Sequence, residues 1–509
     1  MNILYLLPII ILIAGAIIIG LIGRFVKKET AGMNLLYAII ANVSFLAVLG
    51  LIISFYGRIM APLGIDPADL YLQITGTNYS EGIYTIFRID QLTWWFMLVF
   101  TLLGSIVSIY SIKYMDRDDR LDRYYLLLLL LVAGMIGVVV AGDLLTLFIF
   151  WEFMSIASYV LVSFRKEEPE PIEAGIKYLF MSAFGSVILL FGMSLLYGIT
   201  GTLNIAVIGT LLSGATLGGV HVVIIICLII GFGVKAAIIP LHTWLPDAHP
   251  AAPSGISAML SGVVIMTGMF GLTNTLSTFF TSTNTVGFVL LWLAIVTMLV
   301  GNLMALRQTD IKRLLAFSTI LNVGFILFGL SMSMSGINAD AAALGVQGGY
   351  FHIFTHALGK GLAFLCAGAI LYRFHNRELD QLEGIGKKMP ITVGALTIAL
   401  LSLAGVPPLP GFWSKLNMVV AAVGSGDPQY YVGVALFLLS SVVSVVYYLL
   451  VLQRLWFKEP GDQLKDVKET PVEIAVPLVV MVVLLLVVGV APFVFSDLAN
   501  NAAIALLGI

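Results

Sequence analysis

The sequence contains few cysteines, and this shortage argues against a thiolate-bound metal or redox centre. Only two of its 509 residues are cysteine, Cys227 and Cys366, and they lie far apart in the chain. An iron–sulfur cluster or a cysteine-based zinc site needs about four ligands, usually closely spaced in pairs. We therefore expect no cofactor in this chain, and iron–sulfur or metal centres that work with it belong to partner subunits.

Charged residues are also scarce. They make up 11% of the chain, whereas a soluble protein of this length contains roughly a quarter. Hydrophobic residues make up 60%, and the mean hydropathy is +1.05. The formal net charge of −2 offers no basic surface for nucleic acid. So much apolar sequence predicts an all-α membrane protein that crosses the bilayer many times.

Fourteen apolar windows are long enough to cross the roughly 30 Å of hydrocarbon in a bilayer. They cover residues 3–23, 34–56, 92–112, 124–141, 144–164, 174–199, 218–239, 254–280, 286–306, 311–334, 345–373, 390–425, 429–457 and 472–497. The first window is followed by another span and has no small-residue cleavage site. We therefore expect a membrane helix there and not a removed signal peptide.

The lysines and arginines of the loops are distributed unevenly between the two sides. Nearly all of them follow odd-numbered windows, and only Arg58 and Arg88 follow even-numbered ones. Because positive residues concentrate in cytoplasmic loops, we expect a multi-pass protein of the inner or plasma membrane with both termini on the outer side.

The longest outer loop, 57–90, has a pattern of its own. Two stretches, Leu70–Thr75 and Ile83–Ile89, alternate between apolar and polar residues, and the turn-rich segment Gly76–Gly82 lies between them. Alternation of this kind around a turn predicts a small β-hairpin on the outer face.

Four ionisable residues remain inside the predicted spans. They are Glu152, Lys235, Lys360 and Lys415. Asp143 lies at the edge of its window and is a secondary candidate for ion translocation. A charge at the bilayer centre costs about 2.5–3.5 kcal/mol, so something must offset all four. Internal salt bridges that only hold helices together are one explanation. We favour an ion or proton path, because Ser, Thr and small residues could hold helices at lower cost.

Two windows are interrupted by proline next to a buried lysine. Pro240 follows Lys235 in the seventh window, and Pro407 and Pro408 precede Lys415 in the twelfth. A proline inside a helix removes a backbone hydrogen bond. Broken backbone inside a membrane must then be surrounded by protein or water.

The two interruptions lie five spans apart, and paired broken helices are typical of inverted repeats with an ion site at the midplane. We expect these repeats in spans 4–8 and 9–13, with the second inverted because five is odd. The chain then divides into four parts: N-terminal helices with the outer loop (1–123), the first repeat (124–280), the second repeat (286–457), and a C-terminal loop and helix (458–509).

The eleventh window carries three polar residues on one face. His352, His356 and Lys360 lie at positions i, i+4 and i+8, which form one stripe along about 12 Å of helix. A single buried histidine is usually only a core residue. Two imidazoles and an ammonium in one stripe predict a proton relay instead.

The remaining titratable residues have two interpretations each. His242 and His249 lie in the first broken stretch, where they either serve the cytoplasmic mouth of a path or cap exposed backbone. Lys177 either extends to the cytoplasmic surface or pairs with Glu152. We interpret a charged cluster before the tenth window as a topology anchor: Asp310, Lys312 and Arg313.

Four motifs resemble the antiporter-like subunits of respiratory complex I, of Mrp-type sodium/proton antiporters and of membrane-bound hydrogenases. The motifs are Trp151-Glu152, Lys235 through His249, His352 through Lys360, and Pro410 through Lys415. The resemblance covers nearly the whole chain, roughly spans 2–14. It implies a fourteen-helix core of two inverted five-helix repeats.

The resemblance also implies roles for single residues. Glu152 would pair with Lys235, Lys415 would be the outlet residue, and the stripe on the eleventh span would be the relay. Relatives commonly place a central lysine on the eighth span, where this chain has Met266, which cannot bind a proton. Waters, another subunit or a less direct connection between the halves would then replace it. Because the sequence stops just after span fourteen, we expect it to lack the long lateral helix of the longest relatives.

By resemblance, the chain is a non-catalytic subunit that moves protons, or sodium and protons, for an electron-transfer complex. Its partners would be other membrane subunits, a peripheral redox arm and lipid. A subunit of a stand-alone Mrp-type antiporter is the alternative. A solute transporter with inverted repeats fits less well, because the interior supplies titratable groups and not Gly-rich half-helices aimed at a substrate.

Overall fold

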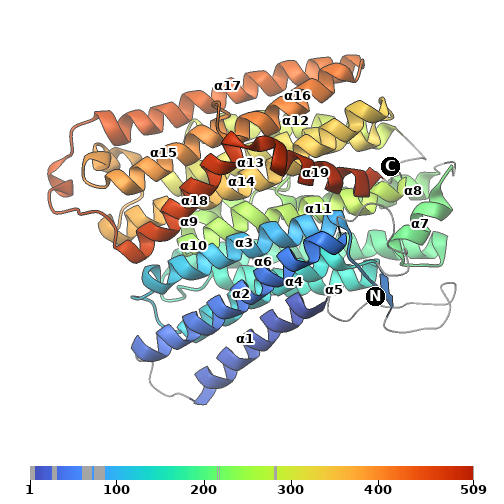
Figure 1. Cartoon of the computed structure of the whole chain (residues 1–509). Helices are drawn as coiled ribbons and strands as arrows, with labels where there is room; N and C mark the ends of the chain where they lie inside the picture. Colours follow the sequence, from blue (N-terminus) through green and yellow to red (C-terminus); the bar gives the residue numbers. More distant parts are fainter. Residues whose placement is uncertain are drawn as a thin grey trace.

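Helices form almost the whole of the described molecule. The computed structural model describes residues 6–25, 31–59, 71–73, 86–214, 216, 218–279 and 284–507. Most helices run roughly side by side, as Figure 1 shows. The predicted class, an all-α polytopic membrane protein, is confirmed.

The helices have the following bounds, in chain order: α1 (Leu7–Phe25), α2 (Ala31–Ile59), α3 (Gln91–Tyr114), α4 (Leu121–Val140), α5 (Leu144–Val162), α6 (Pro169–Thr200), α7 (Ile205–Leu212), α8 (Gly219–Ala236), α9 (Leu245–Ala251), α10 (Ser254–Met259), α11 (Ile265–Leu276), α12 (Thr285–Ala305), α13 (Ile311–Ser331), α14 (Ala339–Phe374), α15 (Pro390–Ala404), α16 (Pro410–Gly424), α17 (Pro428–Phe457), α18 (Val472–Val490) and α19 (Pro492–Leu507). A π-helical segment, Leu260–Val264, joins α10 to α11.

The number of spans agrees with the prediction. Within the described residues, thirteen helices are long and apolar enough to cross a membrane, or up to fourteen if a pair bent by 112° before and along α15 counts as one span. The twelfth predicted window, 390–425, is divided into α15 and α16. The last window, 472–497, is wrong at its C-terminal end, because α18 ends at Val490 and a separate helix, α19, begins at Pro492.

Three spans are fully buried over their most apolar 18 residues, and they form the centre of the molecule. They are the α10–α11 span, α13 and α14. The outer helices α1, α2, α6 and α17 leave most of their spans exposed, and large apolar side chains such as Phe184 and Val187 cover that surface. Polar residues on α14 therefore lie inside protein, where membrane proteins place groups that hydrocarbon would not tolerate.

Small residues allow the central helices to approach closely. A Cβ atom on Gly134 of α4 would lie 2.9 Å from the backbone of Met154 on α5, and one on Gly301 of α12 would lie 2.7 Å from the backbone nitrogen of Leu321 on α13. Close packing through glycine is the usual way that membrane helices associate. The first two helices of each expected repeat therefore pack in the same manner.

The two described strands match the predicted hairpin. Strand β1 (Tyr71–Gln73) pairs antiparallel with β2 (Ile86–Arg88), with Leu72 opposite Phe87. The predicted turn, Gly76–Gly82, lies outside the described residues. Phe87 also forms a bridge to Ala141 at the start of the α4–α5 connection, so the strand pair contacts the helices at that end of the molecule.

Asp143 has a structural role at the start of α5. Its side chain is buried and accepts a hydrogen bond of 2.8 Å from the backbone nitrogen of Thr146, which makes it the N-cap of that helix. The sequence places Asp143 among the secondary candidates for ion translocation. Its carboxylate is already used in capping, which accounts for an acid at this depth without a transport role.

The cap at Asp143 can be tested by two substitutions. Asp143→Ala removes the acceptor and is expected to lower the free energy of unfolding by about 1 kcal/mol. Asp143→Asn keeps a good N-cap and is expected to change it by much less. Thermal unfolding of the purified protein measures both, and an equal loss in both variants would show that the negative charge, and not the cap, is what stabilises the helix.

Candidate ion-translocation site

Lys235 is buried in the last turn of α8 and is held by hydroxyl groups. Its side-chain nitrogen donates to Tyr178 Oη at 2.9 Å and to Ser182 Oγ at 3.4 Å, both on α6. Tyr178 in turn accepts from Ser158 Oγ at 2.9 Å and stacks flat on Trp244, with ring centroids 4.0 Å apart. The ammonium therefore lies among neutral polar and aromatic groups.

Glu152 lies on α5 without a direct contact to Lys235. One carboxylate oxygen of Glu152 is buried and has no hydrogen-bond partner, and Trp151, the residue before it, presents its ring 5.8 Å from the Lys235 nitrogen. Within the described residues no ion pair joins Glu152 to Lys235, so any interaction between the two charges acts through space. Lys177 is not the partner of Glu152, because it pairs with Glu173 at 2.8 Å and Asp247 at 2.9 Å near the surface.

The first helix break lies directly after Lys235. Helix α8 ends where Ala237 takes a left-handed conformation with φ of 55°, and Pro240 lies in the following turn. The freed backbone groups find partners. Ile239 donates from its backbone nitrogen to Thr297 Oγ1 at 3.2 Å, and Trp244 Nε1 donates to the Val234 carbonyl at 2.8 Å. The backbone is thus buried in protein as far as Ile239, whereas Pro240 and Thr243 in the following turn are exposed.

At the second break, Lys415 binds the free backbone carbonyls at the end of α15. Helix α15 ends at Gly405, whose φ of 89° favours glycine, and Pro407 and Pro408 precede α16. Lys415 on α16 donates to the carbonyl of Leu403 at 2.9 Å and to that of Ala404 at 3.2 Å. Those carbonyls are the acceptors that the end of α15 leaves without helical partners.

The stripe predicted on the eleventh span lies in the buried interior of α14. His352 Nδ1 lies 2.8 Å from Ser414 Oγ, and its Nε2 lies 3.0 Å from Asn322 Oδ1. The ring of His356 is 6.4 Å from that of His352 between centroids. Because Ser414 lies on α16 directly before Lys415, the stripe contacts the second broken helix through this hydroxyl.

The other end of the stripe contacts α13 and the π-helical segment. His356 Nε2 lies 3.2 Å from the Ser261 carbonyl. Lys360 donates to the Leu315 carbonyl at 2.9 Å and makes a very short contact with Ser318 Oγ. Lys360 is fully buried. All three members of the stripe therefore face polar atoms of neighbouring helices.

The sequence does not single out a row of polar residues on α13 that contacts the stripe and its surroundings. Ser318 and Asn322 contact the stripe, and Thr319 Oγ1 lies 2.7 Å from Ser261 Oγ. Their spacing of three and four residues in an otherwise apolar helix is the signal that could have identified them. Tyr178 and Ser182 on α6 have the same spacing and are missed for the same reason.

The two groups of polar residues are not joined directly. Among the residues that the structure describes, no hydrogen bond connects the surroundings of Lys235 to those of His356 and Lys360. Met266 is fully buried, as expected for an apolar residue in place of the family's central lysine.

His249 lies between the first break and α14. Its ring is fully buried, stacks on Phe364 of α14 with centroids 4.7 Å apart, and has no hydrogen-bond partner at either nitrogen. The Nδ1 atom of His242 is also buried without a partner. Because neither ring nitrogen of His249 has a partner, the ring does not cap exposed backbone. The other interpretation, that His249 serves the cytoplasmic mouth of a path, is therefore favoured.

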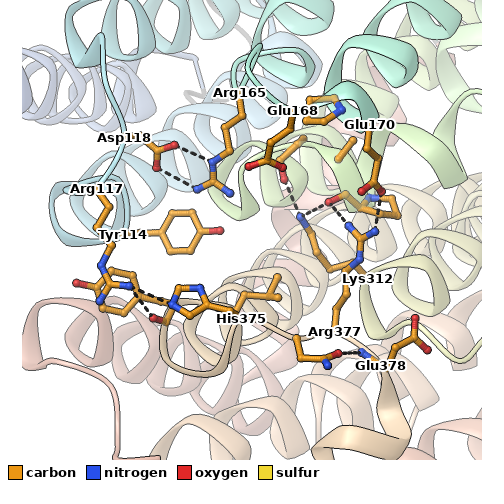
Figure 2. Close-up of a pocket in the computed structure, with 17 residues that line it drawn as sticks. Tyr114, Arg117, Asp118, Arg165, Glu168, Glu170, Lys312, His375, Arg377 and Glu378 are labelled. Carbon is orange, nitrogen blue, oxygen red and sulfur yellow. Dashed lines mark hydrogen bonds and ion pairs between the residues drawn. The ribbon is translucent and has the colours of Figure 1, made fainter.

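A cavity of about 640 Å³ opens at the end of the molecule where most loop arginines lie (Figure 2). Arg165 and Asp118 form a double hydrogen bond at 2.7 and 3.0 Å on one wall. Burial alone would lower the pKa of Arg165, but the bonds to Asp118 raise it above its usual value. Lys312 and Arg377 lie on the opposite wall, together with the carbonyl-bearing Pro250 and Ala252 of the first break.

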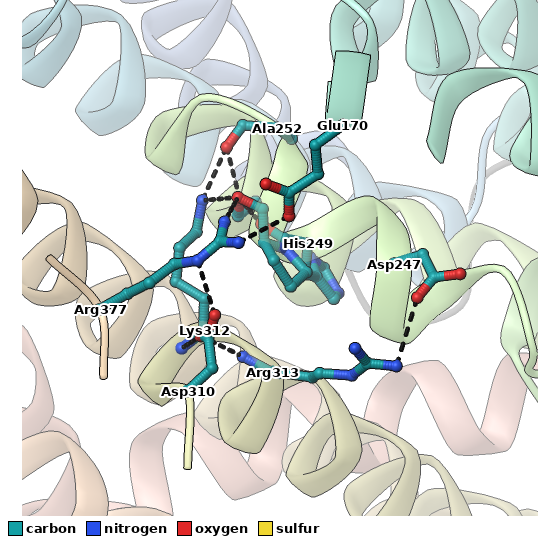
Figure 3. A network of polar contacts seen from close by, with 10 residues as sticks. Glu170, Asp247, His249, Ala252, Asp310, Lys312, Arg313 and Arg377 are labelled. Atoms are coloured by element: carbon teal, nitrogen blue, oxygen red, sulfur yellow. Dashed lines mark hydrogen bonds and ion pairs between the residues drawn. The ribbon is translucent and has the colours of Figure 1, made fainter. Parts of the chain in front are cut away.

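Lys312 does not lie at the surface, although the sequence groups it with Asp310 and Arg313 in a topology anchor. Its side chain is buried and donates to the carbonyls of Pro250 at 3.2 Å and Ala252 at 2.7 Å, as Figure 3 shows. The sequence does not reveal this contact, because the acceptors lie about sixty positions away in the chain. Arg313 does behave as expected, since it is half exposed and pairs with Asp247.

Within the described part of the chain, no group of three or more histidine, cysteine or acidic side chains is placed to hold a metal ion. The free cysteines Cys227 and Cys366 are both buried. The chemistry available in the interior is therefore that of ammonium, imidazole, carboxylate and hydroxyl groups.

Comparison with known proteins gives concordant matches. A family model described as "NADH:quinone oxidoreductase/Mrp antiporter, TM" matches residues 141–444. Another, described as "NADH-Ubiquinone oxidoreductase (complex I), chain 5 N-terminus", matches residues 82–125. The chain is similar to F(420)H(2) dehydrogenase subunit N of Methanosarcina mazei, with 31% identity over 99% of both chains.

Two solved structures have the same fold. A chain of the membrane-bound sulfane sulfur reductase, described as an archaeal respiratory membrane complex, aligns with a TM-score of 0.86 at 29% identity over 99% of this chain and 98% of that one. A chain of the Mrp complex from Dietzia sp. aligns with a TM-score of 0.85 at 22% identity over 100% and 98%. The second likeness shows the fold alone.

The hydroxyl of Tyr178 is expected to stabilise the buried ammonium of Lys235. Tyr178→Phe removes it and keeps the stack on Trp244, so the free energy of unfolding should fall by about 1.5–3 kcal/mol, as for other hydrogen bonds to charged groups. Tyr197→Phe on the exposed part of the same helix is the matched control and should change it by less than about 0.5 kcal/mol. Thermal unfolding measures both, and equal stability of the two variants would contradict this environment for Lys235.

Proposed function

The chain belongs to the NADH:quinone oxidoreductase/Mrp antiporter family and is a membrane subunit of the ion-translocating kind, and from that premise we propose that it moves protons for a multisubunit electron-transfer complex. The path would run through Glu152, Lys235, His356, Lys360, His352 and Lys415. The redox centres would lie in partner subunits.

One observation carries the proposal: the buried lysines have no acidic partner. In the described chain, Lys235, Lys360 and Lys415 bind only hydroxyls and carbonyls. Charged residues inside membranes pair with one another or with backbone carbonyls and commonly mark ion and proton pathways, and here none of the three has a carboxylate partner within the part of the chain that the structure describes. The ion pairs of the described residues lie instead in loops and near helix ends, as between Arg165 and Asp118 and between Arg313 and Asp247. Neutral partners allow each lysine to exist with or without its proton.

Electrostatics between these groups can drive a proton along the path. Two unit charges about 10 Å apart at an effective dielectric constant of about 20 interact by roughly 1.7 kcal/mol, which changes proton occupancy more than tenfold. A movement that changes the separation of Glu152 and Lys235 would therefore load or unload the lysine. Transfer against 100 mV needs about 2.3 kcal/mol per charge, so several groups in series are required.

The connection past Met266 is the least direct step. Hydroxyls of Ser261, Thr319 and Ser318 form a polar surface beside the stripe on α14, and water between Lys235 and this surface would complete the path. The same arrangement gives each half a lysine at a helix break. We propose that these halves are the inverted repeats 124–280 and 286–457.

The similarity favours an electron-transfer complex over a stand-alone antiporter. The relative with 99% coverage and 31% identity is named as a dehydrogenase subunit, whereas the likeness to the Mrp complex has 22% identity.

We place the protein in the inner or plasma membrane, with both termini on the outer side. Its partners would be other membrane subunits and a peripheral redox arm. Isolation of the complex decides: iron–sulfur partners select the main proposal, and purely membrane partners select the antiporter.

Loss of the Lys360 ammonium is expected to stop transport. Lys360→Met keeps an unbranched apolar chain in the same space, so the complex should assemble while proton transport falls at least tenfold. Transport is measured with the purified complex in vesicles that contain a pH-sensitive dye. Lys387→Met is the control, because Lys387 lies at the surface in an ion pair with Glu459. Wild-type transport by both Lys360→Met and Lys235→Met would contradict the proposed path.

A further inference from the structure

A fourth buried lysine, Lys312, is not part of the path proposed above. It lies in the first turn of α13, borders the 640 Å³ cavity and is only 1% exposed. Its side-chain nitrogen uses two of its three N–H donors, on the carbonyls of Pro250 and Ala252. The third donor has no protein acceptor among the described residues.

The nearest acid does not neutralise Lys312. One oxygen of Asp310 accepts the backbone N–H groups of Lys312 and Arg313 at 2.7 and 3.0 Å. The other pairs with Arg377 at 2.7 Å. Burial raises the pKa of Asp310, and the charge of Arg377 opposes that rise. Asp310 is therefore used by the helix cap and by Arg377, and Lys312 resembles the three path lysines in having only neutral partners.

Arg377 fixes the surroundings of Lys312. It pairs with Glu170 on α6 at 2.7 Å and donates to the Pro250 carbonyl at 3.1 Å, as Figure 3 shows. A second cavity of about 400 Å³ shares Glu170, Pro250 and Arg377 with the first. The ion pair between Arg377 and Glu170 thus borders both cavities, whereas Lys312 borders only the first.

His249 is the next titratable group inward from Lys312. It directly precedes Pro250, whose carbonyl Lys312 binds. Both nitrogens of its buried ring are without partners, and the ring stacks on Phe364, one turn from Lys360 on α14. Lys312 therefore has the cavity on one side and an imidazole able to accept a proton on the other.

We propose that Lys312 exchanges protons between the cavity at the arginine-rich end and His249, and so connects that side of the membrane to the stripe on α14. The neutral amine takes a proton from cavity water and becomes an ammonium. The ammonium then gives a proton, through water, to an unpartnered nitrogen of His249 and returns to the amine. One proton and one positive charge enter and leave in each cycle. This role rests on the proposed function.

Substitution of Lys312 by arginine distinguishes a role in proton exchange from a purely structural role. Lys312→Arg keeps a cation that can bind the two carbonyls, but a guanidinium does not give up its proton in proteins. We expect the variant to assemble normally and to lose at least tenfold in proton transport by the purified complex in vesicles. Arg313→Lys, at the exposed neighbouring position, should transport like the wild type. Wild-type transport by Lys312→Arg would show that Lys312 only holds the helix break and would overturn the proposal.

A chemical test covers the case in which Lys312→Arg does not assemble. Lys312→Cys introduces a thiol beside the cavity, and 2-aminoethyl methanethiosulfonate attaches a titratable amine to it. The trimethylammonium analogue attaches a permanent cation. The proposal predicts that only the amine restores transport, with the reagent-treated wild type as control. Equal restoration by both reagents, or by neither, would contradict it.

The result is distinguishable from failure of the proposed function. If Lys360→Met abolishes transport and Lys312→Arg does not, the path holds and only the role of Lys312 is wrong. If Lys360→Met and Lys235→Met transport normally, the path itself is wrong, whatever Lys312→Arg does.

Discussion

The structure depends on the way it accommodates ammonium groups in an apolar interior without pairing them with acids. A buried charge is stable only if its hydrogen-bonding capacity is used. Here hydroxyl groups of neighbouring helices surround Lys235, and carbonyls surround Lys415. A carboxylate at contact distance would hold each proton firmly. Neutral acceptors stabilise the ammonium less, and this leaves the protonated and neutral forms close enough in energy for exchange.

The helix breaks supply many of these acceptors. The last carbonyls of a helix have no intrahelical partner, so they are free to accept from a side chain. Where α15 ends before α16, and where α9 ends before α10, carbonyls are released inside the protein, and Lys415 and Lys312 bind them. The prolines that interrupt the backbone therefore also create the polar sites of the interior. Packing by the fully buried α13 and α14 keeps these sites away from lipid.

Much of the fold could be predicted from the sequence, because apolar length and proline carry local information. The spans, both breaks and the stripe of His352, His356 and Lys360 are local features of this kind. The hydroxyls of Tyr178 and Ser318 are common residue types in membrane helices, and their position beside a lysine depends on packing between distant segments. The burial of Lys312 could not be predicted for the same reason. Beside Asp310 and Arg313 it looks like part of a loop cluster, and only its contact with the distant Ala252 shows that it is buried.

A map of the assembled complex in lipid, at a resolution that reveals ordered water, tests the central claim most directly. The account predicts water molecules that join the surroundings of Lys235 to His356 past the apolar side chain of Met266, so that the titratable groups of both halves form one connected path. A dry, closely packed interior between them would contradict it, because protons could not pass from one half to the other.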